Sequence, residues 1–257
     1  MKKFLIATLC LLFAATFSFA QGDGHQKTET KPEATKAETK PALPTVDQIL
    51  EKFDKVTGSK IRGTKVTSIF TKGTLEIPAL GVSGTVEIYA KAPNKMLSVQ
   101  TIPGFGVISE GYDGQVAWSQ DPTSGIRQKK GEEFAQTKRS ADFAGDLHSQ
   151  FSKFELKGTE KVGDKDAYVI VATPTIGKPE TWFFDTQTGL MIRSDMTIVS
   201  PMGEIPMKNF LEDYREFEGM LIPYTMRQVT TAFTAVVKVD EIKTNVAMDD
   251  AKFAMPK

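Results

Sequence analysis

The strongest constraint on the fold is a regular alternation of side chains between Val82 and Lys91. Every second residue from Val82 onward is apolar or glycine, and the residues between them are Ser, Thr, Glu, Tyr and Lys. Successive side chains of a β-strand point to opposite faces, so this period of two predicts a strand with one buried and one solvated face. A chain built from such strands needs an architecture that covers one face of its sheet.

Similar segments, separated by turn residues, recur along most of the chain. Residues 66–77 are typical of a strand in which Gly73 forms a bulge or bend. Asp113-Gly114 lies between two short apolar runs and is a strong hairpin signal. Further strands are expected at 168–172, 180–185, 190–198, 205–217, 220–229 and 231–243. We expect roughly nine to eleven strands, which favours an antiparallel barrel or sandwich over a βαβ sheet.

Two amphipathic helices are expected among these strands. The first begins after Thr45, which forms a capping-box pattern with Gln48, and it ends at Gly58. Its apolar residues recur at helical spacing: Val46, Ile49, Leu50, Phe53 and Val56. The second helix is expected over 132–154, with an apolar stripe formed by Phe143, Leu147, Phe151 and Phe154.

The N-terminal region differs in composition from the rest of the chain. Residues 1–20 have a basic start, an apolar run too short to cross a bilayer and small residues before Ala20, which together predict a cleaved secretory signal peptide. Residues 21–44 contain no aromatic residue, Ile or Val, and are expected to form a disordered spacer. No linker follows, so residues 45–257 are predicted to be one domain.

Charge and cysteine content exclude several classes of function. The chain has 32 basic and 32 acidic residues, and removal of Lys2 and Lys3 leaves 30 against 32, a mature net charge of −2. No basic stripe is visible, which argues against a nucleic acid partner. Cys10 is the one cysteine and lies in the predicted signal peptide. The mature protein is therefore expected to have no disulfide, thiolate metal site or cysteine nucleophile.

Candidate catalytic residues are equally scarce. The two histidines are His25, in the spacer, and His148, in the second predicted helix, too few for a zinc site or a Ser-His-Asp triad. Gly104-Phe-Gly106 lacks the later glycine and the following helix of a dinucleotide loop. The carboxylate pairs at 132–133 and 249–250 are adjacent in sequence, which is not evidence of one shared cleft. We expect no enzyme activity, metal or cofactor.

The informative feature is a group of soft apolar side chains in the later strands. Six methionines fall between Met191 and Met226, and Trp118 and 182–184 add large aromatic surfaces. Methionine is flexible and polarisable, so these residues fit either an ordinary sheet core beneath the two helices or a cavity for acyl chains. Strand alternation predicts these cavity-lining residues: Val86, Ile88, Trp118, Phe143, Leu147, Phe151, Trp182, Phe184, Ile192, Met196 and Met207.

Several motifs, taken in order, resemble the LolA-like family of outer-membrane lipoprotein-sorting carriers. They are the opening helix from Thr45 to Phe53, the strand-turn-strand Glu110-Gly-Tyr-Asp-Gly-Gln-Val-Ala-Trp118, the hairpin 158–168, the turn Trp182-Phe-Phe-Asp185 to Gly189-Leu190, the strand pair Asp213-Tyr-Arg-Glu-Phe-Glu-Gly219 with Ile222-Pro223, and the closing segment 245–256. The likeness covers nearly all of residues 45–256.

The resemblance implies a mainly β fold with two or three helices, an unclosed antiparallel β-barrel whose helices cover its mouth. It further implies a monomeric periplasmic carrier, or chaperone, that binds acyl chains of a lipid or lipoprotein and exchanges them with membrane-bound donor and acceptor proteins. The expected mechanism is reversible burial, in which the 132–154 helix lifts from the mouth. The alternative is an envelope sensor or regulatory module on the same fold, without transfer activity.

Overall fold

The computed structural model describes residues 43–59, 64–143 and 147–257. The predicted signal peptide and nearly all of the predicted spacer lie outside the described residues. No helix within these ranges is long and apolar enough to cross a membrane.

The described chain is dominated by one antiparallel sheet of thirteen strands. Their bounds are β1 (Ser68–Ile77), β2 (Val82–Lys91), β3 (Lys95–Ile102), β4 (Gly106–Tyr112), β5 (Ala117–Asp121), β6 (Gly125–Gln128), β7 (Phe151–Val162), β8 (Lys165–Pro174), β9 (Glu180–Asp185), β10 (Met191–Ser200), β11 (Gly203–Phe217), β12 (Met220–Val229) and β13 (Thr234–Thr244). The count exceeds the roughly nine to eleven expected, because β3 lacks a clean alternation, β6 is very short and the start of β7 was assigned to the second predicted helix.

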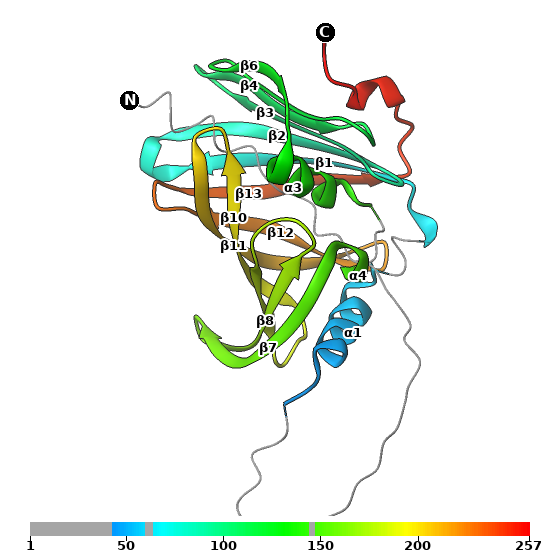
Figure 1. Cartoon of the computed structure of the whole chain (residues 1–257), viewed down its shortest axis with the longest axis vertical. Helices are drawn as coiled ribbons and strands as arrows, with labels where there is room; N and C mark the ends of the chain where they lie inside the picture. Colours follow the sequence, from blue (N-terminus) through cyan, green and yellow to red (C-terminus); the bar gives the residue numbers. More distant parts are fainter. Residues whose placement is uncertain (1–42, 60–63, 144–146) are drawn as a thin grey trace, which may run out of the picture.

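The strand order places two consecutive strands at opposite edges of the sheet. The order is β6-β5-β4-β3-β2-β1-β13-β12-β11-β10-β9-β8-β7. Strands that pair are consecutive in the sequence, except that β1 pairs with β13, while β6 and β7 form the two edges. Residues 129–150, between β6 and β7, therefore connect the two free edges. In Figure 1 the sheet is strongly bent and α3 (Gly131–Ala141) lies in its hollow. The sheet is not closed, which confirms the predicted unclosed barrel.

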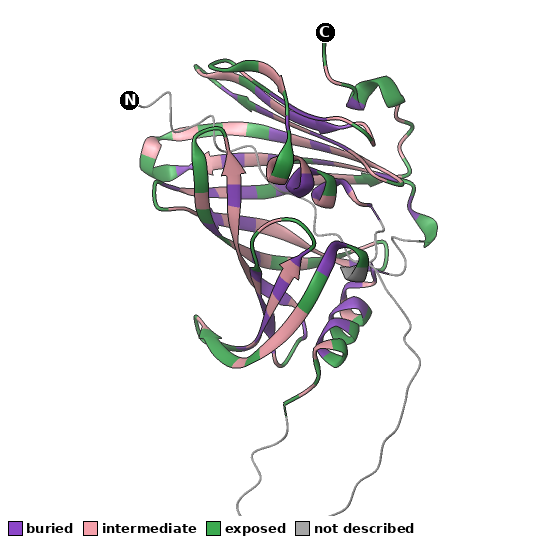
Figure 2. Ribbon diagram, in the orientation of Figure 1, coloured by how far each residue is buried: buried purple, intermediate pink, exposed green. Residues whose placement is uncertain are grey.

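Helix α1 (Val46–Thr57) forms as its caps predict. The Thr45 hydroxyl accepts a hydrogen bond from the Gln48 backbone N–H at 3.2 Å, and the Gln48 side chain accepts one from the Thr45 N–H at 2.9 Å. Gly58 ends the helix with φ 68°, and a Cβ there would lie 2.4 Å from the Gly219 carbonyl oxygen. Figure 2 shows buried residues on one side of this helix and exposed residues on the other.

The second predicted helix is wrong beyond residue 141. Helix α3 ends at Ala141, Asp142 has an extended backbone, and a short helix α4 (Leu147–Gln150) precedes β7. Phe151 and Phe154 lie on β7, where a bulge between Phe151 and Lys153 shifts the register. Both rings pack against Trp182, at 4.9 and 5.8 Å between centroids. The bulge places residues three apart on one face, which imitates helical spacing.

The interior of the bent sheet holds two apolar regions. One, here called the hairpin-end cluster, lies near the β1–β2, β3–β4 and β12–β13 turns; a short 3₁₀ helix, η1 (Pro78–Leu80), joins β1 to β2. Its buried members are Leu75, Ile77, Val86, Ile88, Ile102, Ile108, Phe233, Ala235 and Val237. The other lies beneath α1, where Phe53 meets Phe184 edge to face at 5.4 Å.

The outer face of the sheet carries a smaller core under the C-terminal segment. The 3₁₀ helix η2 (Asp250–Phe253) packs on β3, and the Trp118 indole N–H donates to the Phe253 carbonyl at 2.9 Å. Trp118 lies over Gly111 of the neighbouring strand, where a Cβ would come within 2.3 Å of the indole. Glycine at 111 therefore leaves the space that the tryptophan occupies.

Candidate functional site

A cavity of about 270 Å³ lies between the sheet and the helices α1 and α3. Strands β1–β3 and β9–β13 supply most of its wall, together with α1, the end of α3 and the start of β7. The apolar residues of this wall are Leu50, Phe53, Ile69, Ile88, Ala90, Met96, Ala141, Phe143, Phe151, Trp182, Phe184, Met191, Met196, Leu211, Tyr214, Met220, Leu221, Ile222, Pro223, Met226, Val239 and Ile242.

The cavity wall contains part of the set that alternation predicted. Six predicted residues belong to the wall: Ile88, Phe143, Phe151, Trp182, Phe184 and Met196. Leu147 begins α4, but its side chain lies outside the described residues. Four others are buried elsewhere: Val86, Trp118, Ile192 and Met207. The role of any of these residues in lipid binding stays a prediction.

Ile192 faces away from the cavity because the β9–β10 register is irregular. The pairing shifts between Met191 and Arg193, so Met191 reaches the cavity while Ile192 packs with Val169 and Phe183. Simple alternation placed Ile192 on the same face as Met196. The bulge inserts one residue and moves Ile192 to the other face of the sheet.

The other three misplaced residues have two different causes. Val86 and Met207 lie on inward faces, but Val86 belongs to the hairpin-end cluster, and Met207, directly opposite the wall residue Met196, is buried outside the wall. Trp118 points outward, into the core under the C-terminal segment. Alternation predicts which residues of one strand share a face. It does not predict which of the two faces is the inner one, or which inner residues reach the cavity.

Methionines are a prominent part of the wall. Met191, Met196, Met220 and Met226 come from the stretch that the sequence singles out, and Met96 joins them from β3. Met202 is instead exposed at the β10–β11 turn. Unbranched thioether side chains adapt to ligands of irregular shape, so this wall can change its contour more easily than one of β-branched residues.

Sequence reasoning missed several wall residues that lie far apart in the chain. Leu50 and Phe53 come from α1, whose apolar stripe indicated a buried face without saying what it covers. Tyr214 also belongs to the wall, and its hydroxyl donates to the Met191 carbonyl at 2.8 Å. Burial raises the pKa of Tyr214 well above its usual range, so the phenol stays protonated.

One ion pair lies at the junction of α3 with β9. The Arg139 guanidinium lies 3.2 Å from Glu180 Oε1 and donates to the Ile176 carbonyl at 2.8 Å. Glu180 Oε2 accepts from the Trp182 indole N–H at 3.2 Å. Burial raises the pKa of Glu180, while Arg139 and the indole oppose that shift. Both carboxylate oxygens therefore have protein partners.

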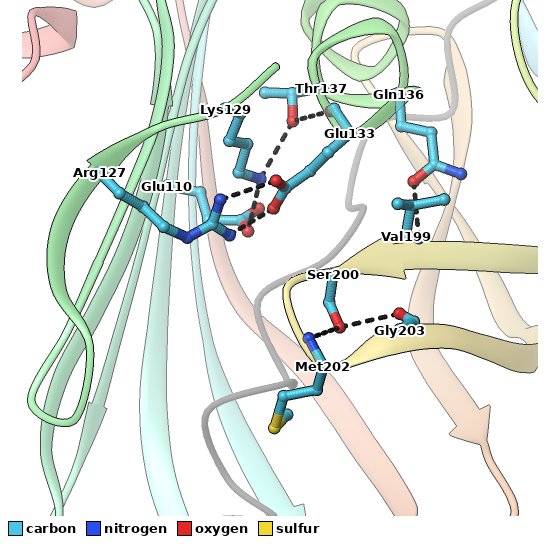
Figure 3. A network of polar contacts seen from close by, with 10 residues as sticks. All are labelled: Glu110, Arg127, Lys129, Glu133, Gln136, Thr137, Val199, Ser200, Met202 and Gly203. Atoms are coloured by element: carbon cyan, nitrogen blue, oxygen red, sulfur yellow. Dashed lines mark hydrogen bonds and ion pairs between the residues drawn. The ribbon is translucent and has the colours of Figure 1, made fainter. Parts of the chain in front are cut away.

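Gln136 fastens α3 to β10, the strand next to β9 on the same side, or arm, of the bent sheet. Its side-chain nitrogen donates to the Thr197 carbonyl at 2.7 Å. Its oxygen accepts from the Val199 N–H at 3.1 Å (Figure 3). One amide thus pairs with two backbone groups of β10, in the manner of an additional strand.

The opposite side of α3 is joined to β4 and β6 by a buried polar network. Lys129, whose side chain is fully buried, lies 2.7 Å from Glu110 Oε1 and donates to the Thr137 hydroxyl at 3.1 Å (Figure 3). Arg127 forms a two-pronged ion pair with Glu133 in the first turn of α3. Helix α3 is thus held to both arms of the bent sheet, across the cavity.

The wall offers no evident catalytic arrangement among the described residues. Glu180 and Asp142 are its carboxylates, and Asp142 accepts from the Gln150 amide at 2.7 Å. No group of three or more His, Cys, Asp or Glu within the described ranges is arranged to hold a metal ion. What this site provides is apolar surface, with polar contacts concentrated where α3 meets the sheet.

Comparison with known proteins identifies the fold. No protein-family model matches the sequence, and no curated protein is similar to it in sequence. A LolA superfamily protein from Nitrosomonas europaea superposes with a TM-score of 0.55 at 15% identity, covering 82% of this chain and 98% of that one.

Two further solved structures have the same architecture. A DUF1329 family protein from Desulfovibrio piger gives a TM-score of 0.53 at 15% identity, with 80% and 97% of the two chains covered. A domain named for outer membrane lipoprotein sorting, from Vibrio parahaemolyticus, gives 0.52 at 10% identity, with 79% and 96% covered. The chain therefore has the LolA-like fold.

Proposed function

We propose that this chain, which has the LolA-like fold, is a periplasmic lipid-binding carrier that shields acyl chains from water. The observation that carries the proposal is the cavity of about 270 Å³, which is walled largely by methionine, aromatic and aliphatic side chains beneath a helix fastened across it. Residues 1–20 act as a secretory signal and residues 21–44 as a spacer. The protein is a binding protein and not an enzyme.

The energetics of burial support such a role. Each methylene that leaves water contributes about 0.8 kcal/mol, so ten buried methylenes contribute about 8 kcal/mol. A hydrogen bond between α3 and the sheet contributes only about 1 kcal/mol. Because the cavity of about 270 Å³ is slightly smaller than the roughly 300–1,000 Å³ typical of ligand pockets, a long chain needs α3 to move outward. Acyl burial is large enough to offset the loss of several such contacts.

The mechanism is reversible opening at α3. The helix is held by discrete polar contacts to β9 and β10 on one arm and to β4 and β6 on the other. Loss of either set frees one edge of the cavity while the other set keeps the helix attached. Acyl chains of a lipid or lipoprotein enter through that edge, and membrane-bound donor and acceptor proteins supply and receive them.

The test is direct recovery of lipid. The full chain is expressed for export in a bacterial host, purified from the periplasmic fraction, extracted with organic solvent and examined by mass spectrometry. We expect co-purified acyl lipid, and binding of a fluorescent fatty acid to the extracted protein with enhanced emission. Absence of lipid together with absence of probe binding would refute the carrier proposal.

A further inference from the structure

Asn209 places an amide inside the wall of the cavity. It lies on β11, directly opposite Ser194 of β10 and Gln228 of β12. Residues directly opposite in an antiparallel sheet point to the same face. Asn209 and Ser194 both line the cavity, so a short polar row crosses a wall that is otherwise rich in methionine and aromatic residues.

The side-chain oxygen of Asn209 is buried and has no hydrogen-bond partner. The other polar side chains nearby differ in this respect, since Glu180 is bonded to Arg139 and Trp182, and Gln136 is bonded to β10. Buried polar atoms in native proteins are nearly always hydrogen-bonded. A buried acceptor without a partner loses its hydrogen bonds to water and gains none from the protein, which costs free energy. A leucine has a similar shape and carries no such loss. The Asn209 oxygen is therefore an acceptor that no other group of the described chain uses.

We propose that Asn209 recognises a hydrogen-bond donor next to the acyl chain of the bound amphiphile, an amide N–H or a hydroxyl. The inference rests on the proposed carrier function and narrows its ligand class. An amide oxygen is an uncharged acceptor, so it matches a neutral donor, and an ammonium group would have to be buried without a counter-charge beside it. Simple fatty esters, which lack a donor, leave the acceptor unpaired and bind more weakly.

Two ligands that differ in one atom test this selectivity. N-methylpalmitamide carries an N–H where methyl palmitate carries an ester oxygen, and both have the same chain. Each is titrated against a fluorescent fatty acid bound to the full chain, in the wild type, Asn209→Leu and Asn209→Ala. We expect the wild type to bind the amide about fivefold to tenfold more tightly than the ester, which is the worth of one hydrogen bond.

Both variants are expected to lose the preference for the amide, with ester affinity retained. Asn209→Ala is the control for any change in ligand binding that the packing of the leucine side chain causes. The temperature of thermal unfolding without ligand is a second measurement. We expect Asn209→Leu to unfold at the wild-type temperature or above, because no protein hydrogen bond is lost. Equal affinity of the wild type for the amide and the ester would overturn the inference, and so would a preference for the amide that survives in both variants. The Asn209 oxygen would then be assigned to a bound water. Failure of the probe and both ligands to bind would overturn the carrier proposal as well.

Discussion

The hairpin-end cluster and the cavity wall share Ile88 and occupy the same interior, but they differ in the kinds of side chain that form them. The hairpin-end cluster consists mainly of Ile, Val and Leu and contains no methionine. The cavity wall includes five methionines and several aromatic rings, and polar groups lie at its junction with α3. Stiff β-branched residues fill space in one conformation, while methionine tolerates several. The difference is what the proposed carrier function requires, with one end maintaining the fold and the other end accommodating a ligand.

The largest expected effect is the loss of stability from truncation in the hairpin-end cluster. Ile77 is fully buried, so Ile77→Ala removes packed methylenes and leaves a cavity. We expect a loss of about 2–5 kcal/mol in the free energy of unfolding, measured by urea titration. Met196→Ala, which enlarges an existing cavity at a half-buried position, is the comparison and should cost about 1 kcal/mol. Equal losses at the two sites would show that the wall is packed as rigidly as the cluster.

The second prediction fills the cavity without touching the cluster. Met196→Trp places a large ring in the wall, and we expect affinity for a fluorescent fatty acid to fall about tenfold or more, since overpacking opposes entry of a chain. Met202→Trp is the matched control, because Met202 is exposed at the β10–β11 turn and lies outside the wall. The same loss of affinity in both variants would place the binding site elsewhere.

Local sequence patterns predict some elements of this fold correctly, whereas features that depend on strand pairing are not predicted. Alternation along β2 and the capping box before α1 are local patterns, and each correctly predicts its element. The bulges at Phe151–Lys153 and Met191–Arg193 are decided by pairing with β8 and β9, which local spacing does not encode. One bulge made a strand resemble a helix, and the other reversed the face of Ile192.

The cavity itself was harder to derive than its surroundings. Trp182, Phe184 and Met196 could be assigned to a common inner surface because they lie on adjacent strands. The contribution of α1 and the positions of Arg139 and Asn209 depend on contacts between segments far apart in the chain. The sequence gives the kinds of side chain that can line a cavity. Where the cavity lies depends on tertiary contacts, which the sequence does not give directly.

The third prediction concerns the attachment of α3, which lies over the cavity. Gln136→Ala removes two hydrogen bonds to β10. We expect the probe to dissociate about fivefold faster, since two hydrogen bonds at about 0.5 kcal/mol each, the lower end of the usual range, contribute about 1 kcal/mol together. Stopped-flow displacement measures the rate, and amide hydrogen exchange of α3 should quicken while that of the hairpin-end cluster is unchanged. Thr234→Ala, a half-buried β13 position outside the cavity wall, should leave the rate unaltered.

The smallest expected effect is a pH dependence that arises at the cavity end from Glu180, since the hairpin-end cluster contains no ionisable side chain. Burial raises the pKa of Glu180 above its unfolded value, so the folded state binds a proton more readily than the unfolded state. Stability is then greatest below the unfolded pKa and declines as the pH rises through the interval up to the folded pKa. Glu180→Gln should flatten this decline in urea titrations between pH values of about 4 and 7, even though it removes the counter-charge of Arg139 at every pH. If the free energy of unfolding has the same slope against pH in both proteins, the contact with Arg139 offsets the burial of Glu180 completely. The stability of the cavity end would then be independent of pH, like that of the hairpin-end cluster.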